Sequence, residues 1–131
     1  TDLVCVIFVD RENNLKLVSQ KISLFKDSGI SCLLLDTFEK RTGDILDFCG
    51  INFLKNFIFK CKERNLKIGL AGGIKEHQIP NMIEISPNII GLRSALCENE
   101  KRHSSIKIQK LKKISQHFNV FNSKAKDSAG A

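Results

Sequence analysis

The chain has 131 residues, 42% of them hydrophobic, and a formal charge of +7. This length predicts about one domain, and no apolar run approaches the roughly 18–20 residues that cross a bilayer, so we expect no membrane partner. The basic charge fits nucleic acid or an anionic metabolite. Because the aromatic residues are nine Phe with no Trp or Tyr, the stacking platforms typical of nucleic-acid modules are missing, and we expect no nucleic-acid partner.

The five cysteines are odd in number, and none forms a CxxC pair. This pattern predicts free, mostly buried thiols in a reducing cytoplasm. A zinc site would need Cys and His clustered at ligand spacing, whereas the three histidines stand apart, so we expect no metal and no cofactor. The chain begins with Thr directly before a strand-like run, which suggests that further sequence precedes it.

Apolar runs rich in β-branched residues alternate along the chain with segments of helical periodicity. In chain order, this pattern predicts strand 3–9, helix 15–27, strand 30–35, helix 51–64, strand 67–71, helix 76–85, strand 88–93 and helix 106–118. The continuous apolar run 3–9 is typical of a strand that is buried on both faces. Residues 1–121 would form the folded domain, and we expect the polar segment 122–131 to be a disordered tail.

Four consecutive βα units predict an α/β fold with a parallel sheet. Two architectures fit: a small doubly wound sheet, or half of a (β/α)8 barrel, whose full length is typically about 250 residues. A doubly wound sheet favours a glycine-rich phosphate loop after its first strand, and the segment VDRENN is not one. We therefore favour four βα units that form the C-terminal half of a TIM barrel.

Charged residues and glycines directly follow the predicted strands, where α/β folds gather their chemistry. They are Asp10 after the first strand, Asp36 and Lys40 after the second, Gly72, Gly73 and Lys75 after the third, and Arg93 and Ser94 after the fourth. Asp36 follows the apolar run CLLL directly, so its carboxylate would be partly buried and would need a partner. Lys40 is either part of a solvated turn, EKRTGD, or an amine whose pKa is lowered by burial.

The stretch from Gly72 to Ser94 has the composition of an anion site. Glycines let backbone N–H groups approach an anion, the start of the following helix adds favourable partial charge, and arginine adds a bidentate fork. The alternative is that Gly72 and Gly73 only form a turn and Arg93 only an ion pair. Spacing leaves both interpretations open.

Two segments in order, LLLDTFEKRTGDILDF and GLAGGIKEHQIPNMIEISPNIIGLRSALC, resemble the C-terminal half of the (5-formylfuran-3-yl)methyl phosphate synthases, which are barrel enzymes of methanofuran biosynthesis. The resemblance covers about residues 30–102. It implies that Asp36 and Lys40 are catalytic, that Gly72, Gly73, Arg93 and Ser94 bind phosphate, and that Asp10 and Lys75 are further candidates. Gly73 stands where the family has Ser, and Ser94 where it usually has Gly.

The resemblance also implies a reaction. Two molecules of glyceraldehyde 3-phosphate would condense to a furan-aldehyde phosphate through a Schiff-base lysine, in lyase chemistry without metal. That lysine lies in the family's N-terminal half, which is not in this sequence, so we expect this chain to be inactive alone. Its partners would be a triose phosphate and another barrel half, or a second copy that covers the strand edges. The alternative function is a non-catalytic half-barrel that binds phosphorylated metabolites or serves as a subunit.

Overall fold

The computed structural model describes residues 1–39, 41–101 and 103–130, with side chains described as far as residue 119. Its strands are β1 Val4–Phe8, β2 Cys32–Asp36, β3 Lys67–Leu70 and β4 Ile89–Ile90. Its helices are α1 Asn14–Gln20, α2 Ile22–Asp27, α3 Ile45–Cys49, α4 Ile51–Glu63, α5 Ile79–Glu84 and α6 Ile108–Gly130, with short 3-10 helices η1 Glu76–Gln78, η2 Ser94–Leu96 and η3 Glu98–Glu100.

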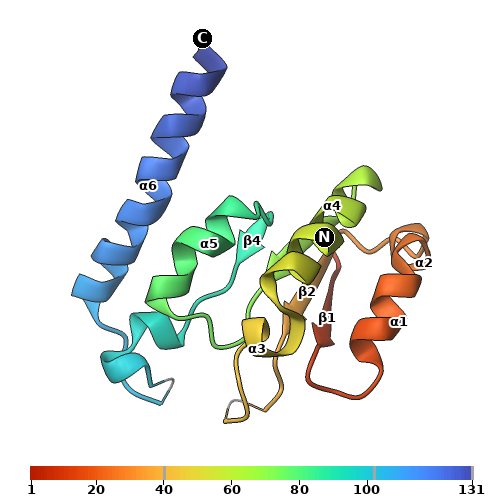
Figure 1. Cartoon of the computed structure of the whole chain (residues 1–131), viewed down its shortest axis with the longest axis horizontal. Coiled ribbons are helices and arrows are strands. Elements are labelled where there is room, and N and C mark those ends of the chain that lie inside the picture. Colours follow the sequence, from red (N-terminus) through yellow and green to blue (C-terminus); the bar gives the residue numbers. More distant parts are fainter. Residues whose placement is uncertain (40, 102, 131) are drawn as a thin grey trace.

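The four strands form one parallel sheet in the order β1-β2-β3-β4 (Figure 1). The register pairs Val4 with Cys32 and then Cys32 with Lys67, so all strands point the same way. The predicted parallel, sequential α/β sheet is thus confirmed. β4 is shorter than predicted, because only Ile89 and Ile90 pair with β3.

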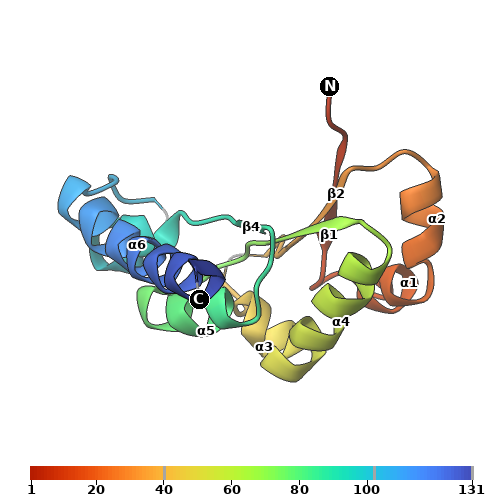
Figure 2. The same ribbon diagram turned by 90° about the horizontal axis from the view of Figure 1, so that it is seen from above.

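The helices α1 to α5 lie on one side of this sheet, as Figure 2 shows. Connections between neighbouring parallel strands are almost always right-handed, and a sequential strand order then puts every connecting helix on the same side. The other side carries no helix among the described residues. Val4 and Val6 are each 45% exposed, and Ile89 is 46% exposed. The prediction that the first strand is buried on both faces was therefore wrong, since no second layer of the described residues covers this face of β1.

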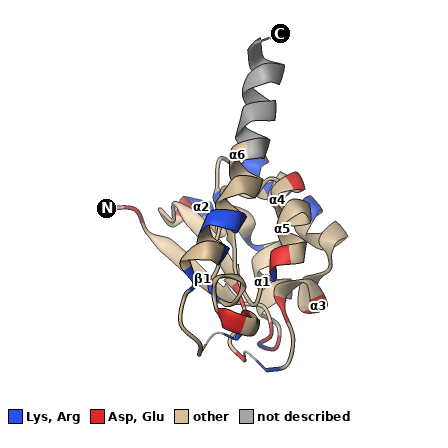
Figure 3. Cartoon of the chain, turned by 90° about the vertical axis from the view of Figure 1, so that its left-hand side faces the viewer, with Lys and Arg blue, Asp and Glu red and all other residues tan. Residues whose placement is uncertain are grey.

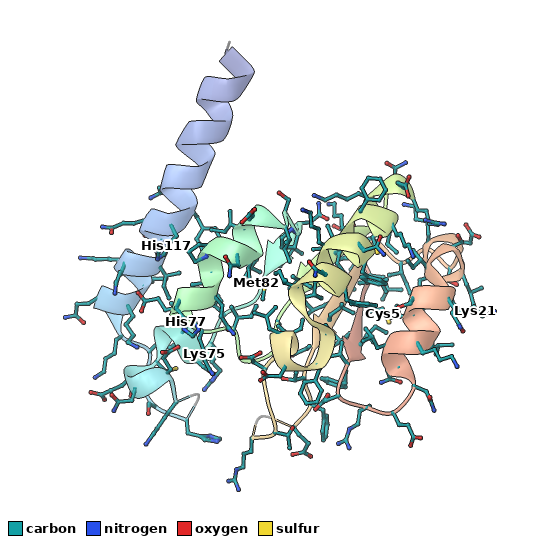
Figure 4. The ribbon with its side chains drawn as sticks, in the orientation of Figure 1. Cys5, Lys21, Lys75, His77, Met82 and His117 are labelled. Atoms are coloured by element: carbon teal, nitrogen blue, oxygen red, sulfur yellow. The ribbon has the colours of Figure 1, made fainter. Side chains whose placement is uncertain are left out.

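The hydrophobic core lies between the sheet and the helices. Leu33 and Leu35 of β2 are fully buried, as are Ile68 and Leu70 of β3. The helical side chains of this core include Val18, Leu54, Phe57, Ile58 and Met82. Figure 4 shows Met82 between α5 and the sheet. This one-sided core fixes where the strands end, and so where the loops of the site begin.

Several helices differ from the predicted ones. The predicted helix 15–27 is divided at Lys21 into α1 and α2. Residues 45–49, predicted as loop, form α3, and Gly50 at φ +71° separates it from α4. Pro80 stands in the first turn of α5, where its missing N–H costs no helical hydrogen bond. The helix α6 runs to Gly130 rather than to Phe118, through the segment predicted as a disordered tail.

Candidate functional site

A cavity of about 600 Å³ opens at the carboxyl ends of β2, β3 and β4. Five of the predicted site residues line it: Asp36, Gly72, Gly73, Arg93 and Ser94. They come from three strand ends that are separate in the sequence and adjacent in the sheet. The loops concerned lie at the lower end of the molecule in Figure 1. Figure 3 shows basic and acidic segments close together in the loops of this end.

The Gly72–Gly73 turn lies directly against the end of β2. Both glycines have left-handed backbone, at φ +104° and +68°. A Cβ on Gly72 would lie 2.9 Å from the Thr37 amide nitrogen and 3.0 Å from its side chain, and a Cβ on Gly73 would lie 3.2 Å from the Asp44 Cβ. The Gly72 carbonyl accepts a hydrogen bond from the Ile45 N–H at 2.8 Å. Glycine is therefore required at Gly72 by contact as well as by conformation.

Backbone N–H groups on the cavity wall are available to an anion. In the part of the chain that the structure describes, the N–H groups of Gly72, Gly73 and Ser94 donate to no acceptor. Arg93 starts the 3-10 helix η2, and its carbonyl accepts from the Leu96 N–H at 2.9 Å. Gly72, Gly73, Arg93 and Ser94 all line this one cavity, and backbone N–H groups together with an arginine suit a phosphate group.

Asp36 ends β2 and lines the same cavity. Its Oδ1 accepts from the Thr37 N–H at 2.7 Å, and its carbonyl accepts from the Val9 N–H at 2.9 Å. Thr37 is fully buried. The carboxylate is thus held at the strand end by its own turn, facing the cavity beside the glycine pair. Lys40, its predicted catalytic neighbour, lies outside the described residues.

Lys75 points to a buried carboxylate. Its Nζ lies 3.8 Å from Oδ2 of Asp44, which also accepts from Gln78 Nε2 at 3.0 Å. The other oxygen of Asp44 accepts from the N–H groups of Leu46 and Asp47 and caps α3. Figure 4 shows Lys75 beside η1 at the lower end of the molecule. The charge of Lys75 therefore balances Asp44, and its role in anion binding stays a prediction.

Asp10 organises the neighbouring loop. Its two carboxylate oxygens accept from the N–H groups of Phe38 at 2.8 Å and Glu39 at 2.7 Å. Burial by itself raises the pKa of Asp10, but these bonds, its own N–H and the nearby Arg11 outweigh it, so that the pKa lies below its usual value. Asp10 lines a different hollow, of about 530 Å³, beside α1. The structure thus ties Asp10 to the loop that follows β2.

The N–H groups at the start of the helix that was predicted after the glycine pair already have acceptors within the chain. The chain enters 3-10 helix η1 there, and the Glu76 N–H donates to Oε2 of Glu100 at 3.3 Å. The Lys75 N–H donates to Oε1 of Gln78 at 2.8 Å. These two N–H groups are therefore satisfied within the chain, and the contribution of this helix start to the anion site stays a prediction.

Sequence reasoning missed three basic residues of the cavity wall. Arg41 comes from the loop before α3, and Lys101 and His103 come from the loop before α6. The charged segments EKRTGD and ENEKRH were visible signals, but nothing local placed the second segment beside the first.

For metals, the described residues contain no group of three His, Cys, Asp or Glu that could hold an ion. None of the described helices combines the length and the apolar character that a membrane span needs.

Residues 1–115 match the model of the family described as 4-HFC-P synthase. The chain belongs to this family. Curated relatives named (5-formylfuran-3-yl)methyl phosphate synthase include one from Methanococcus maripaludis, 35% identical over 94 residues, which are 72% of this chain and 39% of that protein. The Methanocaldococcus jannaschii protein of that name is 34% identical over 88 residues (67% and 37%), and the Archaeoglobus fulgidus protein is 32% identical over 87 residues (66% and 37%).

The chain thus matches about two fifths of the length of these curated relatives. The predicted resemblance to this family is confirmed. The family is one of synthases, so the site described above belongs to an enzyme family.

Proposed function

We propose that this chain is the C-terminal part of an enzyme that condenses two glyceraldehyde 3-phosphate molecules into a furan-aldehyde phosphate for methanofuran biosynthesis. One observation carries the proposal: Asp36, the Gly72–Gly73 turn and the Arg93–Ser94 pair, which come from three different strands, line a single cavity. Membership of the 4-HFC-P synthase family supports the substrate class that we propose. The five free thiols fit a reducing compartment, and we place the protein in the cytoplasm.

In this proposal each group of the cavity has one task. The N–H groups of Gly72, Gly73 and Ser94 and the Arg93 guanidinium bind a phosphate of the triose. The Asp36 carboxylate faces the carbon skeleton, where it accepts a proton, and Lys40 acts beside it as a charged acid or orienting group. The imine forms on a lysine of the N-terminal half, so the reaction is a lyase reaction of the Schiff-base type. No step of this proposal uses a metal or a cofactor.

The architecture we propose is the C-terminal half of a (β/α)8 barrel. Sequential parallel strands with all connecting helices on one side are typical of such barrels and not of doubly wound sheets, which carry helices on both faces. The exposed face of β1 and β4 would then be the barrel interior. Unpaired edges and an exposed apolar face favour aggregation, so another barrel half or a second copy would cover them.

The second candidate is a non-catalytic half-barrel that binds phosphorylated metabolites. The cavity offers an anion site from this chain's own residues, with free N–H groups on three positions. Under this proposal, binding of a phosphorylated metabolite needs no residue from another chain. The two candidates differ in turnover and in Schiff-base formation.

The test joins this chain to the segment of the Methanocaldococcus jannaschii synthase that precedes the matched region. We expect the joined protein to form the furan from glyceraldehyde 3-phosphate, and Asp36→Asn to reduce its turnover by roughly two orders of magnitude or more, as for loss of a general base. Asp27→Asn, on the exposed end of α2, is the matched control. Borohydride should trap the substrate on the added segment and leave this chain alone unlabelled. A folded joined protein that binds triose phosphate without turnover would establish the second candidate.

A further inference from the structure

The cavity wall carries a second group of basic side chains, separate from Arg93. Arg41, Lys101 and His103 line it from two loops that are sixty residues apart in the sequence. Figure 1 shows both loops at the same end of the molecule, one leading into α3 and the other into α6. The folding of the chain thus brings the three side chains to one hollow.

In the described part of the chain, none of these three side chains forms an ion pair. Among the described residues, no carboxylate lies within ion-pair distance of Arg41, Lys101 or His103, and none of the three side chains donates a hydrogen bond. A neighbouring lysine of the same loop, Lys107, does form an ion pair, with its Nζ 3.5 Å from Oε2 of Glu98. The Glu100 carboxylate, which also lines the cavity, accepts from the Glu76 N–H. Unpaired cations around a cavity form an attractive site for an anion.

The basic side chains of the cavity fall into two groups: Arg93 follows β4 beside the three amides, whereas Arg41, Lys101 and His103 belong to the loops before α3 and α6. A phosphate monoester carries roughly −1.5 to −2 charges at neutral pH, and the three amides with Arg93 already suit one such group. A cavity of about 600 Å³ lies within the range of about 300–1,000 Å³ that holds small-molecule ligands. There is therefore room for a second phosphate group, beside basic side chains that the first phosphate does not use.

We propose that Arg41, Lys101 and His103 form a second phosphate subsite, so that this cavity holds both phosphate groups of a six-carbon bisphosphate at once. This inference rests on the proposed function, because a carbon–carbon bond between two triose phosphates gives a six-carbon intermediate that carries both phosphate groups until one is eliminated. The first phosphate lies on the Gly72–Gly73 turn and Arg93. The second lies against the two loops.

The experiment compares two ligands on the intact 131-residue chain by calorimetry: fructose 6-phosphate and fructose 1,6-bisphosphate. We expect the bisphosphate to bind at least roughly tenfold more tightly, since charge-assisted hydrogen bonds to a second phosphate add affinity. In the double variant Arg41→Ala/Lys101→Ala, the two ligands should bind with the same affinity. In Arg93→Ala both ligands should lose affinity by a similar factor, because the first subsite serves both.

General electrostatic attraction is controlled by a double variant of equal charge. Lys16→Ala/Lys21→Ala removes two exposed lysines of the α1 region, and Figure 4 shows Lys21 at the far side of the molecule from η1. This variant should keep the tenfold ratio. Equal affinity of the two ligands in the unchanged chain, or the same loss of ratio in both double variants, would overturn the second subsite. Failure of fructose 6-phosphate to bind would instead count against the first subsite and the proposed function.

Discussion

Replacing Gly72 by alanine tests how closely the turn after β3 approaches the end of β2. The added Cβ would lie 2.9 Å from the Thr37 nitrogen and 3.0 Å from both its Cγ2 and its Oγ1. Left-handed backbone costs a non-glycine residue roughly 1–2 kcal/mol. Overpacking against a buried side chain and rigid backbone adds typically about 1–3 kcal/mol. We therefore expect Gly72→Ala to lower the free energy of unfolding by about 2–5 kcal/mol.

Gly29→Ala is the matched control, because it separates the two costs. Gly29 also has left-handed backbone, at φ +83°, but a Cβ there would meet nothing within 4 Å. Urea unfolding followed by circular dichroism should show a loss of only about 1–2 kcal/mol for this variant, the cost of conformation alone. Equal losses for the two variants would show that Gly72 is not pressed against Thr37, and the description of the cavity wall would fail.

Three further predictions concern individual contacts. Asp10→Asn should lower the free energy of unfolding by about 1–2 kcal/mol at pH 7, as for a lost charge-assisted bond. The pKa of Asp10 is lowered in the folded chain, so the carboxylate stabilises the fold above its unfolded pKa and stops doing so as the pH falls through its folded pKa. The urea midpoints of the variant and the parent should therefore converge below about pH 4. Lys113→Ala should speed hydrogen exchange at the start of α6, since Lys113 bonds Glu76 at 2.8 Å; unchanged exchange would show that this bond does not hold the helix. Burial raises the pKa of Cys49 and Cys61 to about 11, so at pH 8 both thiols should resist iodoacetamide in the folded chain and react in urea, and fast labelling of either would contradict its placement.

The parallel sheet could be predicted because its signals are local. Each strand is an apolar run that ends in a polar or small residue, and strictly alternating strands and helices leave few topologies. The place where the site residues gather could be predicted from this topology, since the carboxyl ends of adjacent parallel strands meet at one edge of the sheet. α3 was missed although Asp44 and Asp47 stand at capping-box spacing, because the helix has only five residues.

Contacts between distant loops could not be predicted from local pattern. The Asp10 carboxylate binds N–H groups 28 and 29 residues away, and Glu100 binds the Glu76 N–H 24 residues away. Both contacts depend on where the loops lie after folding. They use groups that the sequence analysis had assigned to substrate or anion binding. The positions of Arg41 and Lys101 on the cavity wall depend on the same loop packing.

The most direct test of the central claim is an NMR titration of the ¹⁵N-labelled chain with glyceraldehyde 3-phosphate. If the cavity binds the triose phosphate, the amide resonances of Gly72, Gly73 and Ser94 should shift together and saturate with one dissociation constant. The amide resonance of Gly29, remote from the cavity, should stay in place. If the three cavity resonances did not move while the chain remained folded, or if the largest shifts fell on other elements, the site proposed here would be refuted.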